Sequence, residues 1–379
     1  MVKFLFILVT SITSSLYGFY EWDCYERYWL NSEYLYWQIQ AAPKIIPLVV
    51  EGPFVPNGFS MLDQTNSQVI LGGKKGESRW HSGAKFSLGF WGCELCAGVE
   101  FNYLFLSNSS FKKSVASDNL FFSIPFINSI TRQESSILIA EPGIFDGFAA
   151  LKVSNSFQGA EINSILRPCC CYNEETFELF GGIRYINFAE KLIFNTNRLN
   201  IHPAINNKFF TVDRIRVENH FYGGQIGLTV RNRWNALDIK LKTQLAFGAI
   251  CHATHLKGDF YTNDFTGFTF VQHFNGGYFV LPSMSRHRNQ VRFSVVPDVD
   301  FNVGYQIVSG LRLYAGYNFI FIANVVRPSH QLDRKFNPTG SPLYQLSPLP
   351  LSGTRSHKKN LKLINMWIQG MNLGFEWIF

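Results

Sequence analysis

From Met371 to the C-terminus, every odd position is apolar, whereas the even positions up to Glu376 are polar or glycine. Successive side chains of an extended strand point to opposite faces, so this segment has one apolar, strongly aromatic face and one polar face. A strand of a membrane barrel needs this pattern, because one face meets acyl chains and the other a polar interior. An edge strand of a soluble sandwich also alternates, but it rarely exposes so aromatic a face.

The same alternation recurs along most of the chain, and it predicts an all-β, antiparallel up-and-down transmembrane barrel. We expect ten strands, at 33–42, 80–91, 94–106, 147–168, 175–192, 215–230, 236–256, 289–306, 311–327 and 362–379. The predicted links are alternately short (92–93, 169–174, 231–235 and 307–310) and long (43–79, 107–146, 193–214, 257–288 and 328–361). An even strand number with short periplasmic turns and long extracellular loops is typical of outer-membrane barrels.

The two ends of the chain suggest export and assembly. A lysine, a short apolar run and small residues make residues 1–18 a predicted signal peptide, followed by a periplasmic segment at 19–32 and the barrel at 33–379. No apolar run is long enough for a transmembrane helix. We expect the outer-membrane assembly machinery to read the terminal face formed by Phe375, Trp377 and Phe379.

The composition excludes several classes of protein. Only 16% of the residues are charged and 16% are aromatic, which excludes a disordered chain. The net charge of +7 arises in part from the last long loop, between Arg327 and Lys359. Anionic lipid headgroups, including lipopolysaccharide, are the expected partners of such charge, and nucleic acid is not expected.

Four segments resemble the Putative beta-barrel porin-7 family: Glu33–Trp37, Phe221–Leu228, Val295–Val299, and the stretch from Arg312-Leu313-Tyr314 through Tyr317-Asn318-Phe319 to Val326-Arg327-Pro328. The last is the most specific. The resemblance covers about residues 30 to 335 and implies an outer-membrane barrel of a Gram-negative-type cell envelope. It implies no particular solute, and Cys169-Cys170-Cys171 and the loop 336–361 are not features of the family.

Charged residues on the polar faces are the candidate lumen lining. They are Lys85, Glu94, Glu100, Glu161, Glu178, Arg184, Asp238, Lys240, Lys242, Arg292, Asp298, Asp300, Arg312 and Glu376. They either form buried ion pairs that fill the barrel, with Asp300 paired to a residue such as Arg312, or line a pathway that selects solutes. Because ten strands make a narrow barrel, we favour the filled lumen.

The cysteines and histidines give weaker signals. Cys93 and Cys96 point to opposite faces of a strand, which argues against a zinc site. An oxidising envelope allows disulfides, within the chain or with neighbouring envelope proteins, and unpaired thiols are the alternative. His81, His220, His252, His255, His287 and His330 fall near the extracellular rim, where a hydrolase could use them, but no nucleophile motif accompanies them. We therefore expect no enzyme, cofactor or metal.

The predicted function is that of an outer-membrane barrel with a structural or small-solute channel role. A surface adhesion or interaction protein acting through the long loops is the alternative, and a rim hydrolase is a weaker one.

Overall fold

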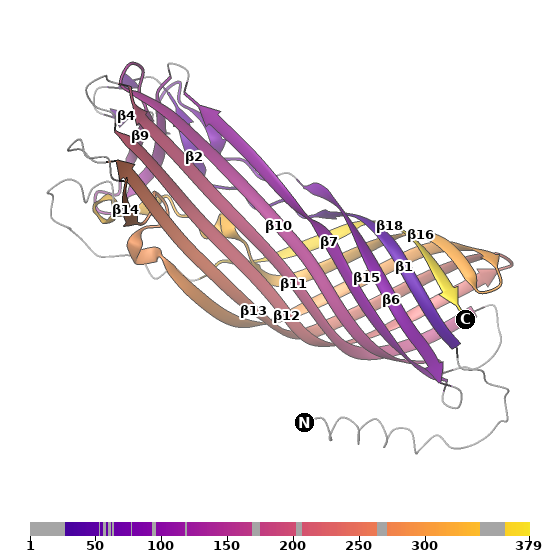
Figure 1. The fold of residues 1–379 in the computed structure, drawn as a ribbon. Coiled ribbons are helices and arrows are strands. Elements are labelled where there is room, and N and C mark those ends of the chain that lie inside the picture. Colours follow the sequence, from indigo (N-terminus) through magenta and orange to yellow (C-terminus); the bar gives the residue numbers. More distant parts are fainter. Residues whose placement is uncertain are drawn as a thin grey trace, which may run out of the picture.

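The computed structural model describes residues 27–379 except 53, 56–57, 60–61, 63, 77, 93–95, 118–119, 169–174, 202–206, 264–270 and 342–360. Within these residues ten long antiparallel strands form one sheet (Figure 1). They are β1 (Arg27–Ile39), β6 (Arg79–Gly92), β7 (Ala97–Ala116), β10 (Phe145–Leu166), β11 (Glu175–Asn200), β12 (Lys208–Trp234), β13 (Leu237–Asn263), β15 (Arg286–Val308), β16 (Leu311–Val326) and β18 (Leu363–Ile378).

The sheet closes on itself. The first strand, β1, pairs with the last, β18. Each of the ten strands pairs with two neighbours, and the pairing of β12 with β13 completes the ring. At the closing seam, Tyr28 and Phe379 exchange two backbone hydrogen bonds of 3.0 Å. The predicted ten-stranded antiparallel barrel is thus confirmed. The first strand begins at Arg27 rather than at residue 33, and the predicted signal peptide lies outside the described residues.

The two ends of the barrel differ. Both chain ends of the barrel and its short turns lie at one end, here called the short-turn end, where Asn235 and Gly310 adopt positive φ values in two-residue turns. At the long-loop end, the connecting segments add a second, five-stranded sheet (Figure 1). Its strands are β2 (Pro47–Glu51), β5 (Gln68–Gly72), β8 (Phe122–Asn128), β9 (Glu134–Ala140) and β17 (Lys335–Phe336). Shorter strands there are β3 (Phe54–Val55), β4 (Gly58–Phe59) and β14 (Val271–Asn275).

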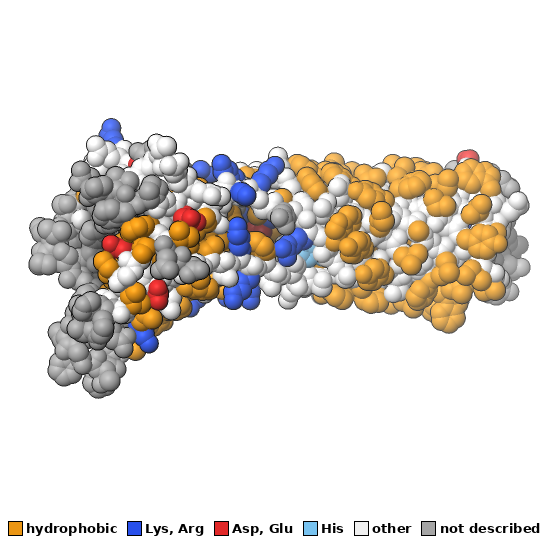
Figure 2. Space-filling view, turned by 90° about the horizontal axis from the view of Figure 1, so that it is seen from above, with side chains coloured by type: hydrophobic (Ala, Val, Ile, Leu, Met, Phe, Trp, Pro, Cys, Tyr) orange, Lys and Arg blue, Asp and Glu red, His pale blue; other side chains and the backbone are white. Residues whose placement is uncertain are grey.

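The polarity of the barrel wall reverses along its length. Near the short turns the outward residues are apolar, as Ile183 with 63% exposure illustrates, whereas the next residue, Arg184, is buried inside. Nearer the long loops the inward residues Leu192 and Phe194 are buried, and the outward Lys191 is exposed. Figure 2 shows the result as an apolar band confined to one half of the barrel. This band is the surface that lipid would cover.

Several strands continue well beyond the apolar band, where the sequence predicted loops. The segment 193–214 was expected to be a loop, but only residues 201–207 separate β11 from β12. The two strands remain paired up to Leu199 and Lys208. Beyond the band many outward residues are polar and many inward residues are apolar. The alternation used to predict the strands, apolar outward and polar inward, therefore no longer applies there. No helix among the residues placed here is long and apolar enough to cross a membrane.

Candidate functional site: the barrel lumen

A first layer of ion pairs crosses the lumen near the short turns. Arg312 on β16 lies between two carboxylates, with its Nε 2.6 Å from Asp238 Oδ1 and its Nη1 3.3 Å from Glu376 Oε2. Arg231 on β12 reaches the same Glu376 at 2.7 Å. Gly304 makes room for the Arg312 guanidinium, because a Cβ at this position would lie 2.2 Å from Nε. This short-turn layer therefore joins β12, β13, β16 and β18 across the lumen.

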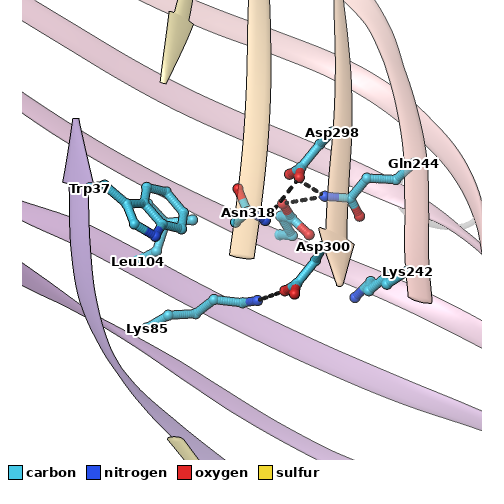
Figure 3. Close-up of a pocket in the computed structure, with 9 residues that line it drawn as sticks. Trp37, Lys85, Leu104, Lys242, Gln244, Asp298, Asp300 and Asn318 are labelled. Atoms are coloured by element: carbon cyan, nitrogen blue, oxygen red, sulfur yellow. Dashed lines mark hydrogen bonds and ion pairs between the residues drawn. The ribbon is translucent and has the colours of Figure 1, made fainter. Parts of the chain in front are cut away.

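A second layer lies deeper in the barrel and is centred on Arg184 of β11. Its Nε is 3.1 Å from Glu161 Oε1 on the neighbouring β10, and its Nη2 is 2.7 Å from Asp298 Oδ2 on β15. Gln244 and Asn318 also donate to Asp298, at 2.8 and 3.1 Å (Figure 3). The Arg184 side chain is only 1% exposed. A charge buried this deeply is stable only because both carboxylates compensate it.

The same middle layer contains two lysines. Lys85 Nζ is 3.2 Å from Glu33 Oε1 and 3.3 Å from Asp300 Oδ2, so it joins β6 to the opposite wall (Figure 3). Lys242 Nζ is 2.8 Å from Glu100 Oε1. Positive and negative groups alternate around the layer, which leaves little free charge to attract an ion of either sign.

The predicted lumen residues have the following positions. Eleven of the fourteen candidates line the inner wall with buried or half-buried side chains: Lys85, Glu100, Glu161, Arg184, Asp238, Lys240, Lys242, Asp298, Asp300, Arg312 and Glu376. Lys240 forms no ion pair within the described part of the chain. Of the other charged residues suggested by the pattern, Glu178 pairs with Arg167 at 2.7 Å, and Glu94 lies outside the described residues.

One lumen candidate is not buried. Arg292 lies on the inward face, directly opposite the buried Ile250 in the sheet register, but its side chain is exposed to solvent. The reason is that β15 pairs with β16 only from Asp298 onward, so the wall around Arg292 has no β16 neighbour. Asp300 belongs to a buried ion pair, as one of the two alternatives had it, and its partner is Lys85 rather than the example given, Arg312.

An apolar layer separates the ion pairs from the long-loop half. Its side chains are inward residues of nine of the ten strands, among them Trp37, Phe157, Phe188, Phe221 and Ile250, each with 2% exposure or less. Two cavities of the lumen, both among the ion pairs, measure about 10 and 20 Å³. Each has room for about one water molecule. The lumen is therefore filled by side chains at this depth.

A segment of the chain also enters the barrel from the long-loop end. At the end of β16, Val326 exchanges two hydrogen bonds with the Asn219 side chain, of 2.8 and 3.0 Å. Arg327 then reaches across the lumen to Glu190 on β11, with Nη2 2.5 Å from Oε1 and Nε 2.8 Å from Oε2, and Nη1 donates to the Gln40 carbonyl at 2.8 Å. Arg327 and Glu190 are both 2% exposed. We call residues 325–341 the inner segment.

The sequence did not mark all of these residues. Glu33, Glu190 and Arg231 were not among the charged candidates. Glu33 is the first residue of a predicted strand, Glu190 lies two residues before the end of one, and Arg231 falls in a predicted turn. Arg327 carried one signal: it belongs to the Val326-Arg327-Pro328 stretch, the most specific part of the family resemblance. In the structure this stretch begins the inner segment.

The long-loop end has an apolar core of its own. Residues of the second sheet, such as Val49 and Ile124, pack with Phe194 of the barrel wall and with Phe279. The carboxylate of Asp213 on β12 accepts hydrogen bonds from the backbone amides of 278–280, at 2.8 to 3.2 Å. Burial raises the pKa of Tyr278 to about 12. The long-loop end is thus folded structure rather than a set of independent loops.

The structure bears on some of the hypotheses about disulfides, free thiols and histidines. Cys96 is in a disulfide and Cys251 is a free thiol, whereas Cys24, Cys93 and the triplet 169–171 lie outside the described residues. His255 and His287 contact each other, with 2.8 Å between their Nδ1 atoms. The described residues contain no cluster of three or more histidine, cysteine or acidic side chains suited to a metal ion.

Comparison with known proteins gives a family and distant structural similarity. The Putative beta barrel porin-7 (BBP7) family model matches residues 29–379. No curated protein sequence matches the chain. Among solved structures, the outer membrane protease OmpT of Escherichia coli is similar with 9% identity and a TM-score of 0.44, over 93% of this chain and 97% of that one. A Pseudomonas aeruginosa FadL homologue is similar with 8% identity and a TM-score of 0.23, over 94% and 90% of the two chains. Because the family model spans nearly the whole barrel, this chain belongs to the Putative beta barrel porin-7 family.

Proposed function

We propose that this protein is a structural barrel of the bacterial outer membrane whose lumen is closed to solutes, and that its long-loop end is the extracellular, working part. The supporting observation is the sealed lumen. Two layers of ion pairs, a layer of aromatic and aliphatic side chains, and the inner segment follow one another along the barrel axis. A permeant ion would have to break several of these layers in succession. Ten strands are also fewer than the 16–18 that leave an aqueous channel in porins.

Planar-bilayer conductance of the refolded full chain tests this proposal. We expect no steady ohmic conductance from the wild type. The matched control carries Trp37→Ala, Phe188→Ala and Phe221→Ala, which empty part of the apolar layer and should raise the frequency of conductance events. Heat-modifiable migration in detergent gels shows that both proteins are folded. Stable wild-type channels of uniform conductance would contradict the closed-lumen proposal and favour the small-solute channel.

An interaction role for the long-loop end is favoured by its folded second sheet. The sheet buries Phe122, Ile124 and Phe126 within its own core while leaving Ile130 and Ile144 48% and 43% exposed. Such a rigid surface loses little conformational entropy on binding. Cells displaying the wild type and a variant lacking residues 129–133, the β8–β9 turn, should differ in autoaggregation or in attachment to immobilised glycans. If the wild type and the variant aggregated and attached equally, the interaction role would be contradicted and only the structural role would remain.

We propose no enzymatic role. Among the rim histidines that suggested a hydrolase, His255 packs against His287 with their ring centroids 3.9 Å apart. His273, which was not among them, lies with its Nε2 2.9 Å from Asp259 Oδ1. His252 is buried against Asn219 at 2.9 Å. A peptidase assay of the refolded chain that showed turnover lost on His273→Ala would contradict this view.

A further inference from the structure

Basic side chains form pairs on the outer face of the barrel, beyond the apolar band. Lys112 of β7 lies directly opposite Lys152 of β10 in the sheet register. Lys191 of β11 lies opposite Arg216 of β12 in the same way. The side chains of all four are exposed. We call these two cross-strand pairs the basic row. Figure 2 shows Lys and Arg side chains gathered between the apolar band and the long-loop end.

The arrangement is unfavourable for the isolated protein. Residues directly opposite each other on neighbouring strands have Cβ atoms about 5 Å apart, and like charges at this distance destabilise a sheet. Lys112, Lys152 and Lys191 form no ion pair with any residue that the structure describes. Among the residues placed in the structure, Glu218 is the one acid that pairs with the row, and its Oε1 lies 2.5 Å from Arg216 Nη2. A multiply charged anion bound between the strands would relieve this repulsion.

The height of the row above the apolar band indicates the kind of anion. Tyr185 and Tyr222 face each other near the upper edge of the band, and Lys191 and Arg216 are six residues further along their strands. At about 3.3 Å per residue and a tilt of about 40°, six residues rise roughly 15 Å. The headgroup layer of a phospholipid is only about 5–8 Å deep on each side. The row therefore stands too high for the phosphate of a phospholipid.

The surface between the band and the row agrees with this estimate. On β11 the outward residues in between are Asn187 and Ala189, and on β10 they are Ser154, Ser156 and Gln158. On β12 they are His220 and Glu218, which contact each other at 3.4 Å. Small and neutral polar side chains, as on β10 and β11, suit a layer of sugars better than either acyl chains or charged headgroups. On these two strands the sequence of zones, apolar, then neutral polar, then basic, matches a lipid whose anionic groups are carried on sugars above the hydrocarbon.

We propose that the basic row binds phosphate groups on the sugars of an outer-leaflet glycolipid of the lipopolysaccharide class. Each pair presents two cationic groups to one phosphate, and charge-assisted hydrogen bonds from both strands hold it. The inference rests on the membrane placement of the proposed function, since it requires the long-loop end to face the outer leaflet. It does not depend on whether the lumen conducts.

Binding of the full chain in detergent micelles to purified lipopolysaccharide tests the proposal, with native mass spectrometry as the readout. The test variant carries Lys112→Gln, Lys152→Gln and Lys191→Gln. The matched control removes three exposed lysines of the same half outside the row, Lys75→Gln, Lys208→Gln and Lys335→Gln. We expect the test variant to lose affinity by about tenfold or more, whereas the control loses less than about twofold. Lipopolysaccharide freed of its core phosphates should bind the wild type as weakly as the intact lipid binds the test variant.

Three results would overturn the proposal. An equal loss in the two variants would mean that overall charge, rather than the row, attracts the lipid. Equal binding of intact and dephosphorylated lipid would exclude phosphate as the ligand. Vesicles of phosphatidylglycerol that bind the wild type as tightly, and lose the same affinity in the test variant, would assign the row to phospholipid. Heat-modifiable migration confirms in each case that the variant is folded, and bilayer conductance of the same samples reports separately on the closed lumen.

Discussion

Removal of Arg184 should be among the most damaging single changes in the barrel. Its guanidinium lies 3.1 Å from Glu161 and 2.7 Å from Asp298. At an effective dielectric constant of about 20, each contact contributes on the order of 5 kcal/mol of attraction, offset by the desolvation of the buried charges. Arg184→Met leaves two buried carboxylates without their cation. We therefore expect a net loss of about 3–5 kcal/mol in the free energy of unfolding.

A triple variant separates this electrostatic cause from lost packing. Arg184→Met combined with Glu161→Gln and Asp298→Asn removes all three charges, and the neutral side chains can still bond to Gln244 and Asn318. We expect this variant to be more stable than Arg184→Met alone. Ile183→Arg is the control for the opposite face, because it places a charge against lipid and should cost about 2–4 kcal/mol near the midplane.

Denaturant unfolding of the refolded proteins in detergent micelles, followed by tryptophan fluorescence, measures these differences. The electrostatic reasoning fails if Arg184→Met costs less than about 1 kcal/mol. It also fails if the triple variant equals the sum of its three single changes, because coupled charges should be strongly non-additive. A tolerated Ile183→Arg would show that this face does not meet lipid.

Three further changes test other parts of the structure. Glu190→Gln removes the carboxylate that Arg327 reaches across the lumen, so it should cost about 3 kcal/mol and make the inner segment sensitive to protease added at the long-loop side; unchanged cleavage would contradict the role of this pair. Gly304→Ala forces a Cβ into a guanidinium and should cost about 1–3 kcal/mol in denaturant unfolding, whereas Gly224→Ala, whose nearest new contact is 3.9 Å away, should be nearly neutral. Deletion of Phe379 removes the two backbone hydrogen bonds to Tyr28 at one end of the closing seam and one residue of the terminal aromatic face, so it should reduce the heat-modifiable form far more than a neutral substitution in the last long loop; equal yields would count against an assembly role for this end.

The number and order of the barrel strands could be predicted from the sequence because lipid imposes a period of two. Phe375 and Trp377 must face acyl chains, and Glu376 between them must face the lumen. A slip of one residue would reverse all three, so the register is strongly determined. The same argument places Arg184 inside and Ile183 outside. Where lipid contact ends, this constraint ends too, and the extensions of β11 and β12 were therefore predicted as a loop.

The partners across the lumen were decided by the tertiary structure alone. A period of two tells which face a side chain occupies, but it does not tell which residue of a distant strand lies opposite. Lys85 and Asp300 are 215 residues apart and meet because barrel closure and strand tilt bring β6 and β15 to the same depth. For this reason the sequence could offer Arg312 only as an example of a partner for Asp300 and could not identify Lys85.

The sequence by itself thus determined the barrel, its ten strands and the identity of its lipid face, because each depends on local alternation. The tertiary structure decided that the lumen is filled, that Arg327 enters it from the long-loop end to meet Glu190, and that the basic row forms. These features depend on the relative depth of strands that are far apart in the chain. That depth is set by the shear of the closed sheet, which no local pattern records.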